Sequence, residues 1–498
     1  MSFKYDIIFD LDGTLWNTKA SYLYAYKKAL QKHPEIKTKF SDDLILNTMG
    51  YTLDIVAKRL FFEVEDKVQI MKECLMDSCY YLINNESTIN EEFIKTIREL
   101  KNNCRFFIVS NCPKEYFDVF FLKLNDNSLF TDYRYLTSTC DKVKNIENLK
   151  TEYAIKDALI VGDSYIDYDA ALKTNMLFGY YNKGYHLSDN FDYLINDPCD
   201  LISIINFNIK KDHILKDATY KKTFHIKNSE LTIFKNDNWN QDKYGFGFIK
   251  NNGNFEELIL KMLENLKSQG IKEIIGPIDY ATWYQYRFQV DNFDLSFLPD
   301  INNSKEEVEV LKKYGFNEKY HYSSTLSTID KNLWNYASRA KLDPKYHLEV
   351  YHDEACYEHL KEIYDISTDC FKEAILYTPI TYDDFKQIYV KNLKVINPDL
   401  VIIYAETEAV AFSLSYPDLK NNIYVSKTVG IKKNHQNSTL IMKLIDASYK
   451  SMADKGYEKV LFHFQNDEKP TLRKVYRHNI ILQKHYAVFS KKYENNNV

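Results

Sequence analysis

The sequence lacks the features that mark membrane, nucleic-acid-binding and disulfide-linked proteins. No apolar run approaches the ~18 residues that a membrane-spanning helix needs, and MSFKYDIIFD leads straight into an expected strand, so we expect no signal peptide and no membrane partner. The 65 Lys and Arg residues do not outnumber the 70 Asp and Glu residues, which argues against a nucleic-acid partner. The eight cysteines show no CxxC pair and no zinc-like spacing, so we expect reduced thiols in a cytoplasmic protein.

The composition is that of a folded protein with several domains. Hydrophobic residues make up 45% and charged residues 27% of the 498 residues, as in ordinary globular proteins. A chain of this length is too long for one hydrophobic core and is expected to form about three domains. The segment Asn206–Asp217 is polar and is expected to be irregular, which makes it the best boundary. We therefore expect domains at residues 1–207, 216–345 and 346–498.

The first 205 residues predict an α/β fold with a Rossmann-like, doubly wound parallel sheet, because short apolar runs alternate with helical patterns. From about residue 17 to residue 88 only helical periods occur, and we interpret this stretch as a helical cap inserted after the first strand. Such a cap would close over the strand ends, where ligands bind in sheets of this kind. The expected strands are Tyr5–Asp10, Cys104–Ser110, Tyr133–Thr137, Ala158–Asp163, Met176–Tyr181 and Tyr193–Ile195.

Residues 216–498 contain a weak internal repeat of helix, strand, helix and strand. The two copies predict two α+β domains of similar fold. In the first copy Leu258–Lys261 opens a helix before the strand Ile271–Ile275, and Glu307–Tyr314 precedes the strand Lys319–Leu326. In the second copy Leu440–Lys443 opens a helix before Tyr457–Phe464, and Thr471–Tyr476 precedes Lys484–Lys492.

The first expected strand ends in Asp10-Leu11-Asp12-Gly13-Thr14. Side chains two residues apart on a strand face the same way, so Asp10 and Asp12 both point to its carboxyl end. A carboxylate there can attack phosphorus and form an acyl-phosphate, which splits hydrolysis into two easier displacements. The second carboxylate can protonate the leaving oxygen and then activate water.

Two further groups suit the transferring phosphoryl group. Ser110 ends the second long strand, where its hydroxyl and the neighbouring N–H groups can bind phosphoryl oxygens. Lys142 lies before the strand that opens at Ala158, and its ammonium can neutralise charge on the nucleophile and on the transferring group. Lys144 is the competing candidate for this role.

A later apolar strand ends in Gly162-Asp163-Ser164-Tyr165-Ile166-Asp167, which places two carboxylates on one turn. Magnesium prefers oxygen ligands. We therefore expect Mg²⁺ to bind Asp10, the backbone carbonyl of Asp12 and Asp163, with Asp167 either a direct ligand or one shell further out.

In this order, and each at a strand end, these motifs resemble those of the haloacid-dehalogenase-like hydrolases, in the branch with phosphoglycolate phosphatases and β-phosphoglucomutase. The resemblance covers about residues 3–205 and implies a Mg²⁺-dependent phosphatase for a small phosphorylated metabolite. It implies the nucleophile Asp10, the general acid/base Asp12, the phosphate binders Ser110 and Lys142, and Asp163 and Asp167 at the metal. True dehalogenases lack the second aspartate of the first motif, so Asp12 argues against dehalogenation.

Two other activities at the same aspartate stay open, a phosphomutase and a carrier-protein loading enzyme. Trp16 resembles a feature of the glyceryl-carrier-protein loading enzymes, which also join such a domain to an acyltransferase-like one. Those enzymes lack this cap and carry Asn where Gly13 stands, so this interpretation ranks lower.

The strand Ile423–Ile431, a polar loop and a helix from Leu440 form an arrangement that suits a pyrophosphate, because helix N-terminal N–H groups favour anions. It resembles the coenzyme A loop of GCN5-related N-acetyltransferases, Q/R-x-x-G-x-G/A. Gln436 fits the first position, whereas Thr439 and Ile441 occupy the two small-residue positions. The resemblance implies acetyl-CoA as cofactor and an amine as acceptor. The candidate cofactor-binding residues are Lys433, Gln436, Asn437, Ser438 and Thr439.

In the same family a tyrosine can protonate the departing thiolate. Tyr476 is the candidate here, with Tyr486 possible instead, but in a chain with 41 tyrosines the interpretation of both as packing residues is favoured. The alternative for the second half is therefore a non-catalytic ligand-binding or assembly module. Residues 216–345 resemble the same fold with a degraded coenzyme loop. The aromatic cluster around Arg287, within Trp283–Phe288, can bind a substrate or form an interdomain contact.

Overall fold

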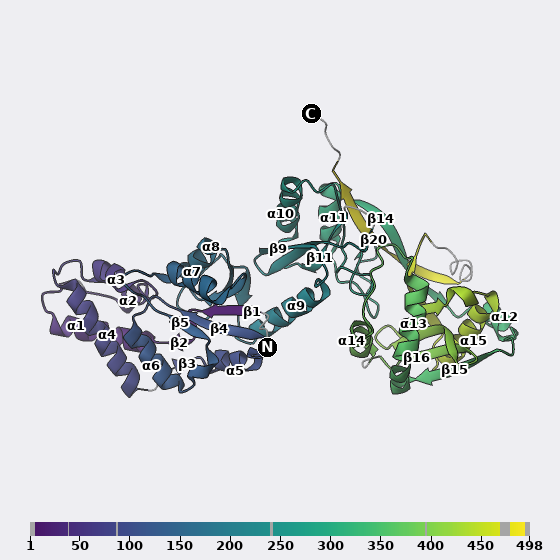
Figure 1. Cartoon of the computed structure of the whole chain (residues 1–498), viewed down its shortest axis with the longest axis horizontal. Coiled ribbons are helices and arrows are strands. Elements are labelled where there is room, and N and C mark those ends of the chain that lie inside the picture. Colours follow the sequence, from purple (N-terminus) through teal and green to yellow (C-terminus); the bar gives the residue numbers. More distant parts are fainter. Residues whose placement is uncertain are drawn as a thin grey trace, which may run out of the picture. The chain divides into compact units, whose positions relative to one another are not determined.

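The computed structural model describes residues 5–37, 39–85, 88–239, 243–393, 396–468 and 479–493. The chain forms two compact units (Figure 1). Unit 1 comprises Met1–His213, His225–Ser229 and Asn251–Asn254, and unit 2 comprises Ile214–Phe224, Glu230–Lys250 and Phe255–Val498. Within the described ranges no helix combines the length and the apolar character that crossing a bilayer requires.

Unit 1 is built on a parallel sheet with the strand order β5-β4-β1-β6-β7-β8, which confirms the predicted α/β architecture. Alternate residues of the central strand face opposite sides: Phe9 packs in one core and Ile8 in the other. The strands are β1 (Tyr5–Phe9), β4 (Cys104–Val109), β5 (Asp132–Arg134), β6 (Ala158–Gly162), β7 (Leu177–Tyr181) and β8 (Tyr193–Ile195).

Helices cover both faces of this sheet. On the Phe9 side lie α5 (Glu91–Leu100), α6 (Lys114–Leu124) and α9 (Asp200–Ile214). On the Ile8 side lie α7 (Lys142–Tyr153) and α8 (Tyr165–Lys173). The expectation of an irregular segment at 206–217 is wrong, because α9 continues through most of it. Leu201 and Ile205, four residues apart, anchor α9 in the core, while Asn206, Lys210 and His213 are exposed and Lys211 is buried.

Four helices with a core of their own follow the first strand (Figure 1). They lie between the short strands β2 (Trp16–Asn17) and β3 (Thr88–Ile89), which pair antiparallel where the chain leaves and re-enters the sheet domain. This helical cap consists of α1 (Lys19–Lys32), α2 (Asp42–Leu46), α3 (Leu53–Leu60) and α4 (Lys67–Asn84). Tyr26, Ile45, Val56 and Ile70 are among the residues that fill its core.

Unit 2 contains one long sheet, with the described strands in the order β15-β16-β17-β18-β19-β14-β20-β12-β11-β10-β9. The strands of its first half are β9 (Tyr220–Ile226), β10 (Ser229–Lys235), β11 (Lys243–Lys250), β12 (Glu273–Gly276), β13 (Phe288–Gln289), which pairs with β20, and β14 (Asn317–Thr328). Those of its second half are β15 (Tyr346–His352), β16 (Asp399–Ala405), β17 (Glu408–Asp418), β18 (Ile423–Ile431), β19 (Lys459–Asn466) and β20 (Ile480–Lys492).

The helices of unit 2 follow the predicted repeat where it falls on described residues. In the first half α10 (Phe255–Ser268) precedes β12 and α11 (Lys305–Lys313) precedes β14, and in the second half α15 (Ser438–Asp454) precedes β19. The predicted helix Thr471–Tyr476 lies outside the described residues. The remaining helices are α12 (Lys331–Ser338), α13 (Leu360–Phe371) and α14 (Tyr382–Leu393). In the second half, α13 and α14 pack on one face of the sheet and α15 on the other.

The two halves of unit 2 exchange their final strands. The last strand of the first half, β14, pairs with β19 of the second half. The last strand of the second half, β20, pairs with β12 of the first, and β14 and β20 pair with each other over most of their length. The two predicted α+β folds therefore share one continuous sheet.

A parallel pair of strands occurs once in each half. β11 pairs with β12 over three residues and β18 pairs with β19 over three, from Tyr424↔Val460 to Ser426↔Phe462. Beyond these short contacts no further pairing joins the strands of either pair in the described residues. The helix that follows the first strand of each pair, α10 or α15, supplies the crossover.

Candidate active site at the tips of β1, β4 and β6

The tip of β1 turns sharply at Gly13, which brings two carboxylates to the edge of the sheet. Gly13 has φ +82°, a left-handed conformation that glycine adopts without strain. A Cβ atom there would lie 2.4 Å from a carboxylate oxygen of Asp163. Gly13 therefore permits both the turn and the close approach of the β1 and β6 tips, with Asp10 directly after β1 and Asp12 two residues further on.

Lys142 forms ion pairs with carboxylates that follow β1 and β6. Its ammonium lies 2.5 Å from Asp10 Oδ1 and also donates to Asp167 Oδ1, and all three residues are buried. Burial lowers the pKa of Lys142, but the two carboxylates outweigh it and raise the pKa above its ordinary value. Lys144, the competing candidate, is exposed. The structure thus places Lys142, and not Lys144, beside the predicted nucleophile.

The turn after β6 is organised by the start of α8. Ser164 caps this helix: its backbone N–H and its hydroxyl donate to Asp167 Oδ2 at 3.0 and 2.7 Å. Asp163 Oδ2 accepts a hydrogen bond of 2.5 Å from the backbone N–H of Tyr185. Both predicted carboxylates are therefore fixed in place, and Asp167 interacts with Lys142 and with the helix cap at once.

Asp10, Asp163 and Asp167 form a cluster that fits a divalent cation. One oxygen from each lies within 4.8 Å of the others, and all three residues are buried. Burial, followed by repulsion from Asp167 and Asp10, raises the pKa of Asp163 well above its usual range, and burial raises the pKa of Asp10 to about 7 despite Lys142. A hard cation with oxygen ligands, such as Mg²⁺, would offset this repulsion. The Asp12 side chain is not part of the cluster, and its carbonyl remains a predicted ligand.

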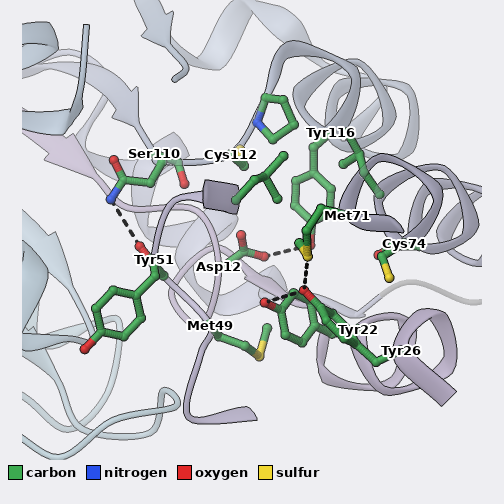
Figure 2. Close-up of a pocket in the computed structure, with 16 residues that line it drawn as sticks. Asp12, Tyr22, Tyr26, Met49, Tyr51, Met71, Cys74, Ser110, Cys112 and Tyr116 are labelled. Carbon is green, nitrogen blue, oxygen red and sulfur yellow. Dashed lines mark hydrogen bonds between the residues drawn. The ribbon is translucent and has the colours of Figure 1, made fainter. Parts of the chain in front are cut away.

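Asp12 points instead toward hydroxyl groups near the cap (Figure 2). Its Oδ1 accepts hydrogen bonds from Thr18 Oγ1 at 2.7 Å and from the Tyr116 hydroxyl at 2.8 Å. Burial raises its pKa, although both hydrogen bonds oppose that change. The Tyr185 hydroxyl in turn accepts from the backbone N–H of Thr18 at 2.6 Å. Thr18, Tyr116 and Tyr185 were not predicted as site residues, because none of them lies in a motif.

A cavity lies between Asp12 and the cap, and Figure 2 shows its lining. The sheet domain contributes Asp12, Ser110, Asn111, Cys112, Pro113 and Tyr116. The cap contributes aromatic, sulfur-containing, aliphatic and hydroxyl side chains, namely Tyr22, Tyr26, Tyr51, Met49, Met71, Cys74, Leu53, Leu75 and Ser78, together with Gly50. Ser110 thus lies in the same cavity as Asp12, as its position at the end of β4 predicts.

Polar contacts hold the cap over this cavity. The Asn111 side-chain amide donates to the Gly50 carbonyl at 3.1 Å, and a ring nitrogen of His186 lies 3.1 Å from the Met49 carbonyl. The Tyr165 and Tyr51 hydroxyls share a hydrogen bond. The loop after α2 is therefore joined to two loops of the sheet domain and to the start of α8, which holds the cap beside the cavity.

In unit 2 the predicted coenzyme loop lies at the start of α15. The Asn437 side chain caps this helix by accepting from the Leu440 N–H at 2.9 Å, and Gln436, Asn437 and Ser438 are exposed. The Lys433 N–H donates to Asp369 at 2.9 Å, and its ammonium pairs with Glu373. The loop is accessible, but the charge of Lys433, which was predicted to bind the coenzyme, is already neutralised by Glu373.

Of the two candidate tyrosines, only Tyr486 lies among the described residues. Tyr476 lies outside the described residues. Tyr486 is buried in β20, its hydroxyl donates to Asp300 Oδ1 at 3.2 Å, and burial raises its pKa above the ordinary value. A thiolate-protonating role for either tyrosine remains a prediction.

Comparison with known proteins identifies the first unit. Residues 7–180 match the family described as haloacid dehalogenase-like hydrolase, so unit 1 contains a hydrolase domain of that family. This confirms the resemblance at the N-terminus, and no family match supports the acetyltransferase resemblance of unit 2. No curated protein matches the chain.

Several solved structures resemble the first part of the chain. A predicted phosphoglycolate phosphatase from Haemophilus somnus is 22% identical with a TM-score of 0.37, over 41% of this chain and 97% of its own. A haloacid dehalogenase-like protein from Streptococcus pneumoniae is 19% identical with a TM-score of 0.36, over 41% and 99%. A predicted phosphatase from Clostridium acetobutylicum is 15% identical with a TM-score of 0.36, over 42% and 100%.

The charge balance of this site gives a prediction about stability. Lys142→Met removes the counter-charge of a buried carboxylate cluster and should lower the free energy of unfolding of unit 1 by about 3 kcal/mol. Lys144→Met, two residues away and exposed, should change it by less than about 0.5 kcal/mol. Pulse proteolysis in urea, with mass spectrometry to follow peptides of unit 1, measures both. Equal midpoints for the two variants would contradict the assignment of Lys142.

Proposed function

We propose that unit 1 is a Mg²⁺-dependent phosphatase that hydrolyses a phosphate monoester through a phospho-aspartate at Asp10. One observation carries the proposal: a buried carboxylate at the tip of β1 lies beside Lys142 and the Asp163–Asp167 pair, while Asp12, two residues on, faces the cap cavity. Nucleophile, counter-charge, metal ligands and acid/base thus meet at one edge of the sheet.

The residues divide the reaction between them. An Asp10 oxygen attacks phosphorus as the bond to the leaving oxygen breaks, and Asp12 gives its proton to that oxygen. Thr18 and Tyr116 hold Asp12 in place, and afterwards Asp12 takes a proton from the water that attacks the acyl-phosphate. Lys142 and the Ser110 hydroxyl offset charge on the phosphoryl oxygens. Mg²⁺ bound by Asp10, Asp163 and Asp167 would neutralise further charge on the same group.

The cap cavity favours a leaving group without charge. None of the residues that line it is Lys, Arg or His, and Asp12 supplies its one carboxylate. Arg59 stacks on the outer Tyr51 at 4.1 Å and is itself exposed. A carboxylate moved into this cavity would lose its water and gain no cation, which costs several kcal/mol. We therefore propose a small phosphate ester of a neutral alcohol, with Tyr22, Tyr26 or Ser78 available to its hydroxyl groups.

Unit 2 has a second candidate function, acetyl-CoA-dependent acyl transfer to an amine. The observation that favours it is the parallel pair β18–β19, which is joined over only three residues and is followed by the accessible start of α15. Strands that separate in this way leave room for an extended ligand, and the helix start offers N–H groups to a pyrophosphate. Bulk at Ile441 and the Lys433–Glu373 pair oppose such binding.

The nucleophile prediction concerns Asp10. Asp10→Asn should abolish turnover of phosphate monoesters, because an amide is a far weaker nucleophile, and leave the fold intact. Asp12→Asn should still form the intermediate slowly and accumulate it, since departure and hydrolysis both need the acid/base. Borohydride reduction of enzyme quenched during turnover, followed by peptide mapping, should label Asp10 alone. Normal turnover by Asp10→Asn would end the proposal.

The specificity prediction uses a panel of phosphate esters with Mg²⁺. Esters of neutral alcohols should exceed phosphoglycolate in kcat/KM by at least about tenfold, which corresponds to about 1.4 kcal/mol of discrimination. Met71→Lys places an ammonium among the lining residues and should shift the ratio toward phosphoglycolate. The turnover of acetyl phosphate, which has a small leaving group, reports whether the variant still performs the chemistry. A preference of the wild type for phosphoglycolate would refute the neutral leaving group while leaving the phosphatase standing.

The coenzyme prediction is tested by calorimetry of acetyl-CoA binding to the whole chain. Ser438→Glu adds a carboxylate at the start of α15 and should weaken binding at least tenfold, because it repels phosphate. Lys450→Glu, on the last turns of the same helix, changes the charge by more and should have little effect. Absence of heat at millimolar acetyl-CoA would leave unit 2 as a binding or assembly module.

A further inference from the structure

Arg287 is a buried cation without a counter-charge among the residues that the structure describes. Arg287 is only 5% exposed. Its Nε and Nη1 atoms have no hydrogen-bond partner among the described residues. The rings of Tyr286, Tyr322 and Phe464 surround it, with centroids 3.7, 4.3 and 4.1 Å from the guanidinium carbon. Burial lowers its pKa. Ring contacts offset part of the cost of burying the charge, but they leave the two N–H groups unsatisfied.

Lys427 is a second cation without an ion pair in the described part of the chain. The register of β17 with β18 passes from Leu414↔Thr428 to Ser415↔Ser426, so Lys427 is the extra residue of a β-bulge. It comes directly after Ser426, the last residue of β18 that pairs with β19. Its ammonium lies over the Tyr389 ring at 4.5 Å, and burial lowers its pKa to about 8. Bulges re-aim side chains and are frequent beside functional sites.

The two cations lie at neighbouring positions of the opening, because Lys427 follows Ser426, which pairs with Phe462, and Arg287 contacts the ring of Phe464. His463 lies on β19 just after the last residue that pairs with β18, and burial lowers its pKa to about 4, with the charges of Arg287 and Lys427 both adding to this effect. One ring nitrogen lies 2.9 Å from the Ser324 hydroxyl and the other 2.5 Å from the Pro299 carbonyl. The histidine is therefore neutral and fully hydrogen-bonded.

The nearby carboxylate does not supply the missing charge. The charge of Asp300 acts to raise the pKa of His463. However, Asp300 already forms an ion pair of 2.7 Å with the buried Lys484 and accepts a hydrogen bond from the Tyr486 hydroxyl. Arg287 itself forms no ion pair with a carboxylate among the described residues. Two cations thus lie where β18 and β19 separate, and the described residues there offer them no anion.

We propose that Arg287 and Lys427 form a binding site for a small oxyanion, the carboxylate or phosphate group of a ligand, where β18 and β19 separate. The unsatisfied guanidinium N–H groups suit a planar pair of oxygens, and Lys427 adds a point charge from the opposite strand of the opening. The surrounding rings exclude water and so strengthen the attraction. The site requires neither the phosphatase nor the coenzyme function.

Binding of sodium succinate and of inorganic phosphate to the whole chain tests this site. Calorimetry in EDTA, against sodium chloride of equal ionic strength, should detect at least one of the two anions. Arg287→Met and Lys427→Met should each weaken that binding at least tenfold, whereas Lys420→Met, an exposed lysine in the turn before β18, should not. Succinate alone would indicate a carboxylate ligand, phosphate alone a phosphorylated one, and both a general oxyanion site.

Stability of the free protein separates this site from a packing role. A buried charge kept for a ligand can be replaced by an apolar side chain of similar size without loss of stability, so Arg287→Met should melt at or above the wild-type temperature in chloride. It should also lose the rise in melting temperature that the bound anion gives to the wild type. The proposal is overturned if neither anion binds, if binding persists in Arg287→Met, or if this variant melts several degrees lower while anion binding by Lys427→Met is unchanged.

Discussion

Lys142 places one ammonium group among three buried carboxylates at the edge of the parallel sheet, and the rest of the site depends on that balance. Its partners Asp10 and Asp167 are 132 and 25 residues away in sequence, so the interaction joins the end of β1 to the starts of α7 and α8. Without the ammonium, carboxylates within 4.8 Å of one another would have to take up protons or move apart. Even with it they keep excess negative charge. This surplus destabilises the domain without a metal, but it suits a divalent cation, whose charge can in turn offset that of a phosphoryl group.

The motif residues of this site could be predicted from sequence because a parallel sheet brings strand tips together. Asp10, Asp163 and Ser110 each directly follow an apolar strand, and such positions converge whatever lies between them. The hydroxyls that hold Asp12 could not be predicted. Tyr116 reaches it from α6 across 104 residues, and a chain with 41 tyrosines gives no sign of which one does so. Thr18 lies only six residues from Asp12, but its contact depends on the turn at Gly13.

The fold shows the same division between local and non-local information. Helical periods predicted the cap, because each of its helices buries one face in the hydrophobic core that the cap helices share. The helix α9 was not predicted through residue 214, because Asn206, Asn208 and Lys210 interrupt its apolar pattern although Ile205 and Ile214 are buried. In unit 2 the repeat predicted the elements but not their partners. Strands β14 and β20 are the last strands of the first and second copies of the repeat. The periodicity of the sequence does not determine whether each of them pairs within its own half or with the other half. The exchange depends on long-range pairing that leaves no local pattern.

The two units also treat buried charge differently, and this difference bears on what each can bind. In unit 1 the surplus is negative and a cation is the missing partner. In unit 2 the buried Lys484 is paired with Asp300, whereas the two cations where β18 and β19 separate have no ion pair among the described residues. There Arg287 and Lys427 are held by aromatic rings alone. A buried guanidinium without an anion gains nothing in stability from its charge, so the retention of Arg287, with the half-buried Lys427 near it, is best explained by a ligand that brings the anion.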